Sequence, residues 1–313
     1  MAKSKPNELR LVRVYDAPVK LVWEAFTNEK HQAKWWGPRG FTITTKSKDL
    51  RPGGQWIYTM HGPDGVDWPN IATYHEVEKY SRLVYDHGAT ETTPPLFRVT
   101  VTFEEFKGKT VMDMTMALEN EKAAKEIGKF IKQASGNSTW DRLAEYLEEE
   151  QKQKEIFVIN RTFEAPIATV FEMWSNPAHL SKWLPPTGLQ MEILKGNIQE
   201  KGSLFYSMGN SSVTFYGRIN YLNITPVTHL SYTQEFADKE GNLSRHPGAP
   251  TWPASMLTNV TFTEEDDGQT RVTVQWEPHG QVTSEELKAF IDEKPGMTAG
   301  WSGSFDKLDE LLK

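Results

Sequence analysis

Histidine side chains are the first candidates for chemistry in this sequence. His61, His75 and His87 fall on or near neighbouring predicted strands, where three imidazoles could converge on a metal ion. None of them has a close ligand spacing such as His-x-His, so we predict no metal site and no other cofactor. The sequence also lacks a Gly-x-Ser-x-Gly elbow and the glycine-rich motifs of nucleotide binding. A triad hydrolase and a nucleotide-binding protein are therefore unsupported.

A row of large side chains gives a stronger signal. Trp56, Tyr58 and Met60 alternate along one predicted strand and so project to the same side. By the same period, Tyr74 and Glu76 share a side of the next strand. Tyrosine hydroxyls and one carboxylate in apolar surroundings are typical of a small-molecule pocket. Two alternatives remain: the aromatic residues only fill a core, or Glu76 or a tyrosine acts as a catalytic acid or base.

Proline, asparagine and glycine define the elements that must position these side chains. Alternation predicts a strand over 8–15, and Pro18 is a favourable first residue for a helix that runs to about residue 27. Asn28 can cap a second short helix. Strands are then predicted over 41–50, 55–60, 70–78, 82–87, 97–106 and 110–118, and a closing helical segment over 121–149.

Several residues of the second short helix and of the turn after it occur twice in the chain. Asn28, His31, Lys34, Trp35, Pro38 and Gly40 are matched in order, at one constant separation, by Asn176, His179, Lys182, Trp183, Pro186 and Gly188. The chain is therefore a tandem duplication, and each copy of about 150 residues has the usual size of a domain. We predict two domains, residues 1–150 and 151–313.

The repeated histidines, His31 and His179, allow a catalytic interpretation. Each follows a capping asparagine by three residues on a short helix that must pack against the rest of its domain. A structural role is therefore the favoured prediction for both.

The second copy repeats the aromatic strand and adds one loop. Tyr206, Met208 and Tyr221 occupy the positions of the large side chains of the first copy. A loop insertion near 237–254 carries Trp252 and three prolines. This loop could cover the mouth of the second pocket or equally dock against the first domain. The second closing helix is predicted over 284–312, with an interruption at Pro295-Gly296.

Composition restricts the class of protein. Of the 313 residues, 38% are hydrophobic and 25% are charged, and the formal net charge of −7 with interspersed acids and bases disfavours a nucleic-acid partner. We see no apolar run long enough for membrane insertion and no secretory signal. The chain has no cysteine. These features predict a cytoplasmic protein.

The first copy resembles a known family. The residues that carry the resemblance are Asp16-Ala17-Pro18, Val22-Trp23, Trp35-Trp36-Gly37-Pro38-Arg39-Gly40-Phe41, Asp49-Leu50-Arg51-Pro52-Gly53-Gly54 and Met60-His61-Gly62-Pro63-Asp64-Gly65. The order of elements is similar to the helix-grip fold of the START-like (SRPBCC) superfamily. The motifs resemble, within it, the family named after homologues of the heat-shock-protein-90 ATPase activator.

The second copy departs from the family pattern. Leu184 stands in place of Trp36, and Pro185 in place of Gly37. Gly300-Trp301 resembles the closing-helix motif of the family, and we align this pair with Ser135-Gly136 of the first copy.

The resemblance implies an α+β fold, two tandem helix-grip domains, each with a curved antiparallel sheet, two short helices and a long C-terminal helix. It also implies a cavity between sheet and closing helix that binds a hydrophobic small molecule, lipid-like or polyketide-like, with the first copy as the better candidate. The alternatives are an ATPase-activating module with a chaperone partner and a cavity enzyme of cyclase, dehydratase or hydrolase type. The predicted ligand-binding residues are Trp56, Tyr58, Met60, Tyr74, Glu76, Phe130, Tyr206, Met208, Tyr221 and Trp301.

Overall fold

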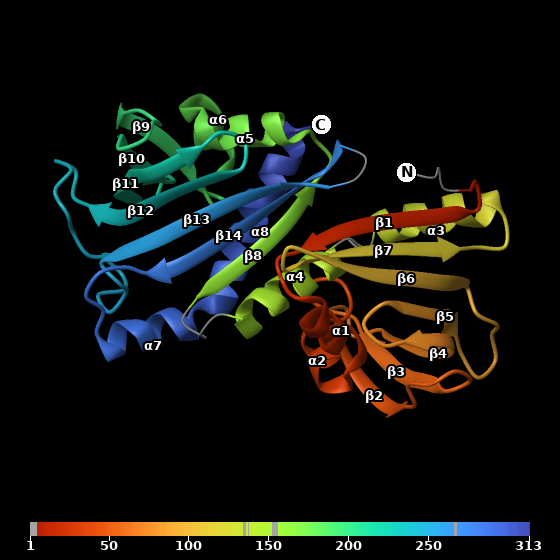
Figure 1. Cartoon of the computed structure of the whole chain (residues 1–313). Helices are drawn as coiled ribbons and strands as arrows, with labels where there is room; N and C mark the ends of the chain where they lie inside the picture. The colour runs from red at the N-terminus through yellow and green to blue at the C-terminus, as the bar shows by residue number, and fades with distance from the viewer. Residues whose placement is uncertain (1–4, 134–135, 137, 152–155, 266–267) are drawn as a thin grey trace. The chain divides into compact units, whose positions relative to one another are not determined.

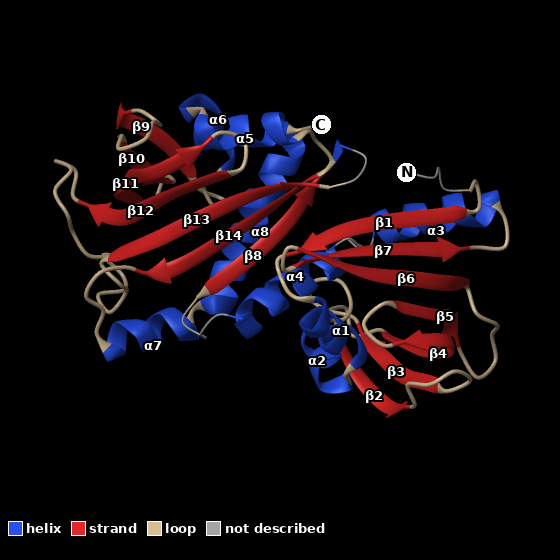
Figure 2. Ribbon diagram, viewed as in Figure 1, coloured by secondary structure: helices blue, strands red, loops and turns tan. Residues whose placement is uncertain are grey.

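Two antiparallel sheets, one in each half of the chain, organise the structure (Figures 1 and 2). The computed structural model describes residues 5–133, 136, 138–151, 156–265 and 268–313, and the chain divides into Met1–Gln151 and Lys152–Lys313. Each 7-stranded sheet has the same topology: β1-β7-β6-β5-β4-β3-β2 in the first domain and β8-β14-β13-β12-β11-β10-β9 in the second. The predicted α+β fold of two tandem helix-grip domains is confirmed.

The first domain follows the predicted order of elements. Its first strand precedes two short helices, and six strands follow before the closing helices. The bounds are β1 Glu8–Tyr15, α1 Val19–Thr27, α2 Glu29–Trp35, β2 Thr42–Lys48, β3 Gln55–His61, β4 Asp67–Glu78, β5 Arg82–Ala89, β6 Phe97–Phe106, β7 Lys109–Ala117, α3 Glu121–Gln133 and α4 Ser138–Gln151.

The second domain repeats this order. The bounds are β8 Phe157–Phe163, α5 Ile167–Ser175, α6 Pro177–Trp183, β9 Gln190–Gly196, β10 Ser203–Gly209, β11 Thr214–Thr225, β12 His229–Ala237, β13 Ser255–Glu264, β14 Thr270–Pro278, α7 Ser284–Asp292 and α8 Lys294–Leu311.

The repeated residues make the same contacts in both domains. The side chain of Asn28 accepts a hydrogen bond from the backbone N–H of Lys30, and Asn176 caps α6 in the same way, as predicted. The indole N–H of Trp35 donates to the carbonyl of Ala25 at 3.0 Å, and Trp183 makes the equivalent bond to Met173 at 2.9 Å. These contacts join the two short helices of each domain because each indole reaches from the second helix to the first.

The closing segment is two helices in each domain. In the first domain α3 ends at Gln133 and α4 begins at Ser138, while Ser135 lies outside the described residues. In the second domain the break is at Glu293, two residues before the predicted interruption. Pro295 stands in the first turn of α8, where a residue without an N–H group is well tolerated. The proline therefore begins a helix here and does not interrupt one.

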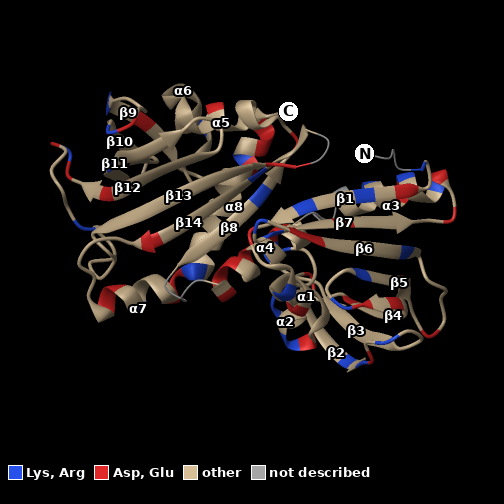
Figure 3. Cartoon of the chain, in the orientation of Figure 1, with Lys and Arg blue, Asp and Glu red and all other residues tan. Residues whose placement is uncertain are grey.

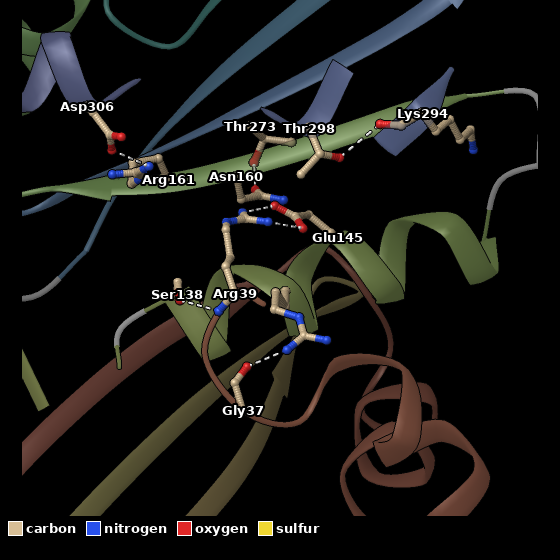
Figure 4. A network of polar contacts seen from close by, with 11 residues as sticks. Gly37, Arg39, Ser138, Glu145, Asn160, Arg161, Thr273, Lys294, Thr298 and Asp306 are labelled. Carbon is tan, nitrogen blue, oxygen red and sulfur yellow. Dashed lines mark hydrogen bonds and ion pairs between the residues drawn. The ribbon is translucent and has the colours of Figure 1, made fainter. Parts of the chain in front are cut away.

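Polar contacts hold each closing helix to the loop after the second short helix, and Figure 4 shows those of the first domain. In the first domain Arg142 donates to the carbonyl of Gly37 at 2.7 Å, and the backbone N–H of Arg39 donates to Ser138 Oγ at 3.0 Å. In the second domain Lys307 donates to the carbonyl of Pro185 at 2.7 Å. Because Pro185 corresponds to Gly37, both copies use a cation on the closing helix to bind the same carbonyl.

Candidate functional site

The second domain contains a cavity of about 630 Å³, between the inner face of its sheet, helix α8 and the loop after β12. Figure 1 shows α8 crossing that face of the sheet. Aromatic rings and methionine side chains make up a large part of the wall, and Figure 3 shows few charged residues along β13, one of the inner strands of the sheet. Among the wall residues are Tyr206, Phe215, Phe236, Trp252, Trp276 and Trp301.

Three of the predicted ligand-binding residues line this cavity. Tyr206 and Met208 reach it from β10, and Trp301 reaches it from α8. Tyr221 is not part of the wall: it is buried in the core of the second domain, where its ring centroid lies 5.6 Å from that of Tyr232.

In the first domain the predicted pocket residues pack against one another. The rings of Trp56 and Tyr58 stack with centroids 3.9 Å apart, and Trp36 meets Trp56 edge-on at 5.0 Å. Tyr74 is buried beside them, and Met60 packs partly buried against the same core cluster. We expected the first copy to be the better candidate for a ligand site, whereas the structure has the large cavity in the second copy.

Glu76 does not share a face with Tyr74, contrary to our expectation. Strand β4 pairs Tyr74 with Tyr85 and Glu76 with Val84, so His75 is an extra residue that forms a β-bulge. The bulge reverses the alternation, and Val77 packs against the core while Glu76 is exposed and pairs with Arg82 at 2.7 Å. A catalytic role for Glu76 inside a pocket is therefore excluded by its position.

Phe130 does not line the cavity. It is 55% exposed on α3, so its ring is not enclosed between helix and sheet. The prediction used helical spacing over one long segment, whereas the structure divides that segment: α4 packs against α1 and α2, and α3 packs against β1.

Smaller side chains in the second domain leave space for the cavity. Leu184 lines the cavity at the position where Trp36 fills space in the first domain. Gly300, on α8, also lines the cavity, and a Cβ atom added there would meet no other atom within 4 Å. The substitution of Trp36 by Leu184, which marks a departure from the family pattern, thus removes bulk where the cavity lies.

The closing helices align differently from the sequence prediction. Trp140 stacks on Phe26 with ring centroids 6.4 Å apart, and Trp301 stacks on Trp174 at 6.0 Å. Phe26 and Trp174 hold the same position on the first helix of their domains, so Trp140 is the counterpart of Trp301. The alignment of Trp301 with Gly136 was therefore wrong.

The loop insertion covers one side of the cavity. Trp252 packs between Trp276 of β14 and Phe290 of α7, with ring centroids 6.0 Å from each. Arg245 pairs with the carboxylate of Glu286 on α7 and donates to the carbonyl of Trp252 at 3.1 Å. The loop is thereby attached to α7, whose first turn Glu286 also caps by accepting from the backbone N–H of Thr283 at 2.8 Å.

The attachment of the loop should depend on pH. The backbone N–H of Thr283 and the Arg245 guanidinium hold the pKa of the Glu286 carboxyl below its usual value. The stabilisation is therefore complete above the unfolded pKa of about 4.3 and is lost as pH falls through the lower folded pKa. We expect Glu286→Gln to destabilise the second domain by about 0.5–1 kcal/mol at pH 7, because Arg245 is largely exposed.

Denaturant unfolding of Glu286→Gln and wild type between pH 7 and pH 3 measures this effect. The difference in unfolding free energy should shrink toward pH 3. Lys288 and Asp292 form an exposed pair on the same helix, so Asp292→Asn serves as a control that loses a salt bridge without detaching the loop. A difference between Glu286→Gln and wild type that stays constant with pH would contradict the assignment.

Polar side chains also line the cavity, Tyr206, Gln234 and His246 among them. Gln234 Nε2 donates to the hydroxyl oxygen of Tyr206 at 2.7 Å, and burial raises the pKa of Tyr206. The backbone N–H of Gly248 donates to His246 Nδ1 at 3.0 Å, and burial lowers the pKa of His246. Both residues are therefore uncharged near neutral pH and can offer hydrogen bonds to a ligand, while Glu293 is an acidic residue of the lining.

The histidines of the first domain do not converge. His61 contacts Asp67 at 2.6 Å, His75 contacts Asp86 at 2.8 Å, and burial lowers the pKa of His87 to about 4. Within the described ranges, no group of three or more His, Cys, Asp or Glu side chains could hold a metal ion. His31 contacts the hydroxyl of Tyr146 on α4 at 2.5 Å, and its structural role stays a prediction.

The fold defines the class of protein: a tandem pair of START-like domains, one of which encloses a cavity beneath its closing helix. The sequence profile of the family described as activator of Hsp90 ATPase homolog 1-like protein matches residues 16–148 and again residues 164–313. The chain belongs to this family. No functionally curated protein matches the sequence.

Several solved structures are similar. Protein Ms6760 from Mycobacterium smegmatis is 23% identical, with a TM-score of 0.43 over 51% of this chain and 91% of that chain. A protein from Staphylococcus epidermidis is 26% identical, with a TM-score of 0.43 over 48% and 95%. The di-domain ARO/CYC BexL from the BE-7585A biosynthetic pathway is 11% identical, with a TM-score of 0.40 over 98% of both chains.

In the part of the chain that the structure describes, every helix is too short or too polar to cross a bilayer.

Proposed function

We propose that the second domain binds a hydrophobic, largely aromatic small molecule in the cavity beneath α8. The observation that carries this proposal is the cavity itself, whose volume of about 630 Å³ lies within the usual range of ligand sites. Family membership supports it in general terms, since domains of this fold commonly bind hydrophobic ligands.

The chemistry of the wall favours rings over flexible chains. Trp252, Trp276 and Trp301 lie near one another around the cavity, with centroid separations of 6.0 Å and 6.5 Å along the series. Aromatic faces and edges attract a planar ligand by offset stacking and edge contacts. Met208, Met256 and Met297 add polarisable sulfur, which adapts to irregular ring systems.

Binding without catalysis is the simpler interpretation of the same wall. Because burial raises the pKa of Tyr206, its hydroxyl is a poor general base near neutral pH. The carboxylate that we considered as a catalytic group, Glu76, lies exposed in the other domain. The proposed role is therefore capture or transport of a ligand.

Native mass spectrometry of the purified protein, followed by solvent extraction and identification of what is released, tests the proposal. We expect a bound aromatic or lipid-like molecule. Trp252→Ala should weaken its binding at least fivefold, since truncation of an aromatic wall residue typically costs about 1–2 kcal/mol or more. Trp68→Ala is the matched control, because Trp68 is exposed on β4 of the first domain.

A protein mass without adduct, together with no stabilisation by a panel of hydrophobic compounds, would contradict the proposal. The alternative of a chaperone partner would then rank first, and activation of a chaperone ATPase would be the assay to perform. Equal loss of ligand in Trp252→Ala and Trp68→Ala would place the bound molecule outside this cavity.

A further inference from the structure

One polar pair is built into the apolar wall of the cavity. Gln234 lies on β12 between the positions of Tyr232 and Phe236, and its amide donates to Tyr206 across β11. Gly217 stands opposite Tyr206 in the strand pairing, and a Cβ atom there would come within 2.4 Å of the tyrosine hydroxyl. The absence of a side chain at this position thus lets Tyr206 lie across β11 and meet Gln234.

This pair retains hydrogen-bonding capacity. The Tyr206 oxygen accepts from Gln234, so its own O–H can donate to another group. The Gln234 amide keeps a carbonyl oxygen and a second N–H. Since both residues line the cavity, these groups are available to a ligand that carries an oxygen atom.

The charges around the cavity select against anions. Among the lining residues that the structure describes, none is a lysine or an arginine, while Glu293 belongs to the lining. The carboxylate of Glu235 accepts a hydrogen bond from Asn220 and lies on the opposite face of β12 from Gln234. His246 supplies no positive charge near neutral pH, because burial lowers its pKa. A carboxylate in this cavity would lose hydration without gaining a countercharge.

We infer that the cavity selects an uncharged ring compound with a carbonyl or hydroxyl oxygen, which hydrogen-bonds to Gln234 and Tyr206. This inference rests on the proposed function and adds two specificity determinants to it. The polar pair discriminates an oxygenated ligand from a hydrocarbon, and the lack of basic residues discriminates it from an acid.

Three anthracene derivatives of similar size, carrying an acetyl, an ethyl or a carboxylate group, test the inference by calorimetric titration of the full chain. The acetyl compound should bind about fivefold more tightly than the ethyl compound, as expected for one net hydrogen bond. The carboxylate should bind at least tenfold more weakly than the acetyl compound.

Two variants test whether Gln234 and Tyr206 cause the preference for the acetyl compound. Gln234→Leu should remove the preference for the acetyl over the ethyl compound, and Tyr206→Phe should reduce it, while the affinity for the ethyl compound stays within about twofold. His87→Leu is the matched control, because His87 is the equivalent position in the first domain. It lies two residues after Tyr85 on β5, as Gln234 lies two residues after Tyr232 on β12. This variant should leave all three affinities unchanged.

The outcomes separate the inference from the proposed function. Binding of none of the three compounds would contradict both. Binding of all three, with equal affinities or with a preference that survives Gln234→Leu, would overturn the inference and leave the hydrophobic site intact. Tightest binding of the carboxylate would also overturn it.

Discussion

Replacement of Gly300 by tryptophan should strongly weaken ligand binding and leave the second domain at least as stable as the wild type. Gly300 lines the cavity from α8, and a Cβ atom added there meets no other atom within 4 Å. An indole at this position would occupy space that the ligand needs. Because the ligand then binds only if packed side chains move, we expect a cost of about 1–3 kcal/mol, roughly a 5- to 150-fold loss of affinity.

The stability of the same variant should change in the opposite direction. Glycine in a helix interior is about 1 kcal/mol less favourable than alanine, and an added ring would contact Trp301 and its neighbours inside the cavity. Gly300→Ala is the control: it should gain about 1 kcal/mol in unfolding free energy and keep its ligand affinity within about twofold. Calorimetric titration and denaturant unfolding of both variants measure the two effects.

Unchanged ligand affinity in Gly300→Trp would show that the ligand binds elsewhere. A loss of affinity accompanied by a loss of stability would indicate disruption of α8 in place of a filled cavity. The pair of measurements thus distinguishes a blocked site from a damaged domain.

Local patterns in the sequence predicted most of the fold. Asn28 and Asn176 cap their helices, and the alternation of β3 gives the right faces, because caps and strand alternation depend on neighbours in the chain. The tandem duplication was equally visible, since Trp35 and Trp183 recur with their surrounding residues.

The candidate site was harder to predict because it depends on register and volume. The bulge at His75 moves Glu76 to the outer face, and a bulge is set by the pairing of two strands that are separated in sequence. A leucine at position 184, where the first domain has Trp36, can leave a cavity or a repacked core. The outcome depends on how all the surrounding side chains pack. We predicted Tyr206, Met208 and Trp301 as pocket residues, and all three line the cavity. We did not predict Gln234 of β12 or Gly300 of α8 as lining residues.

Equivalent tryptophans allow the stability of each domain to be tested separately. Trp35 and Trp183 are fully buried, each in the core of its own domain, and each donates its indole N–H to a carbonyl of the preceding helix. Trp35→Ala should destabilise the first domain, and Trp183→Ala the second, by about 3–5 kcal/mol, through a cavity and an orphaned carbonyl.

Scanning calorimetry measures the thermal unfolding of the two domains, and each variant should shift the transition of its own domain only. For a domain of this size, the expected loss lowers the midpoint of one thermal transition by roughly 10 °C. The other transition should stay in place, since each domain has a hydrophobic core of its own. A ligand of the second domain should raise only the transition that Trp183→Ala lowers, because binding stabilises the domain that it contacts. A single transition that both variants shift equally would show that the duplicated domains unfold as one cooperative unit, and would contradict independent cores.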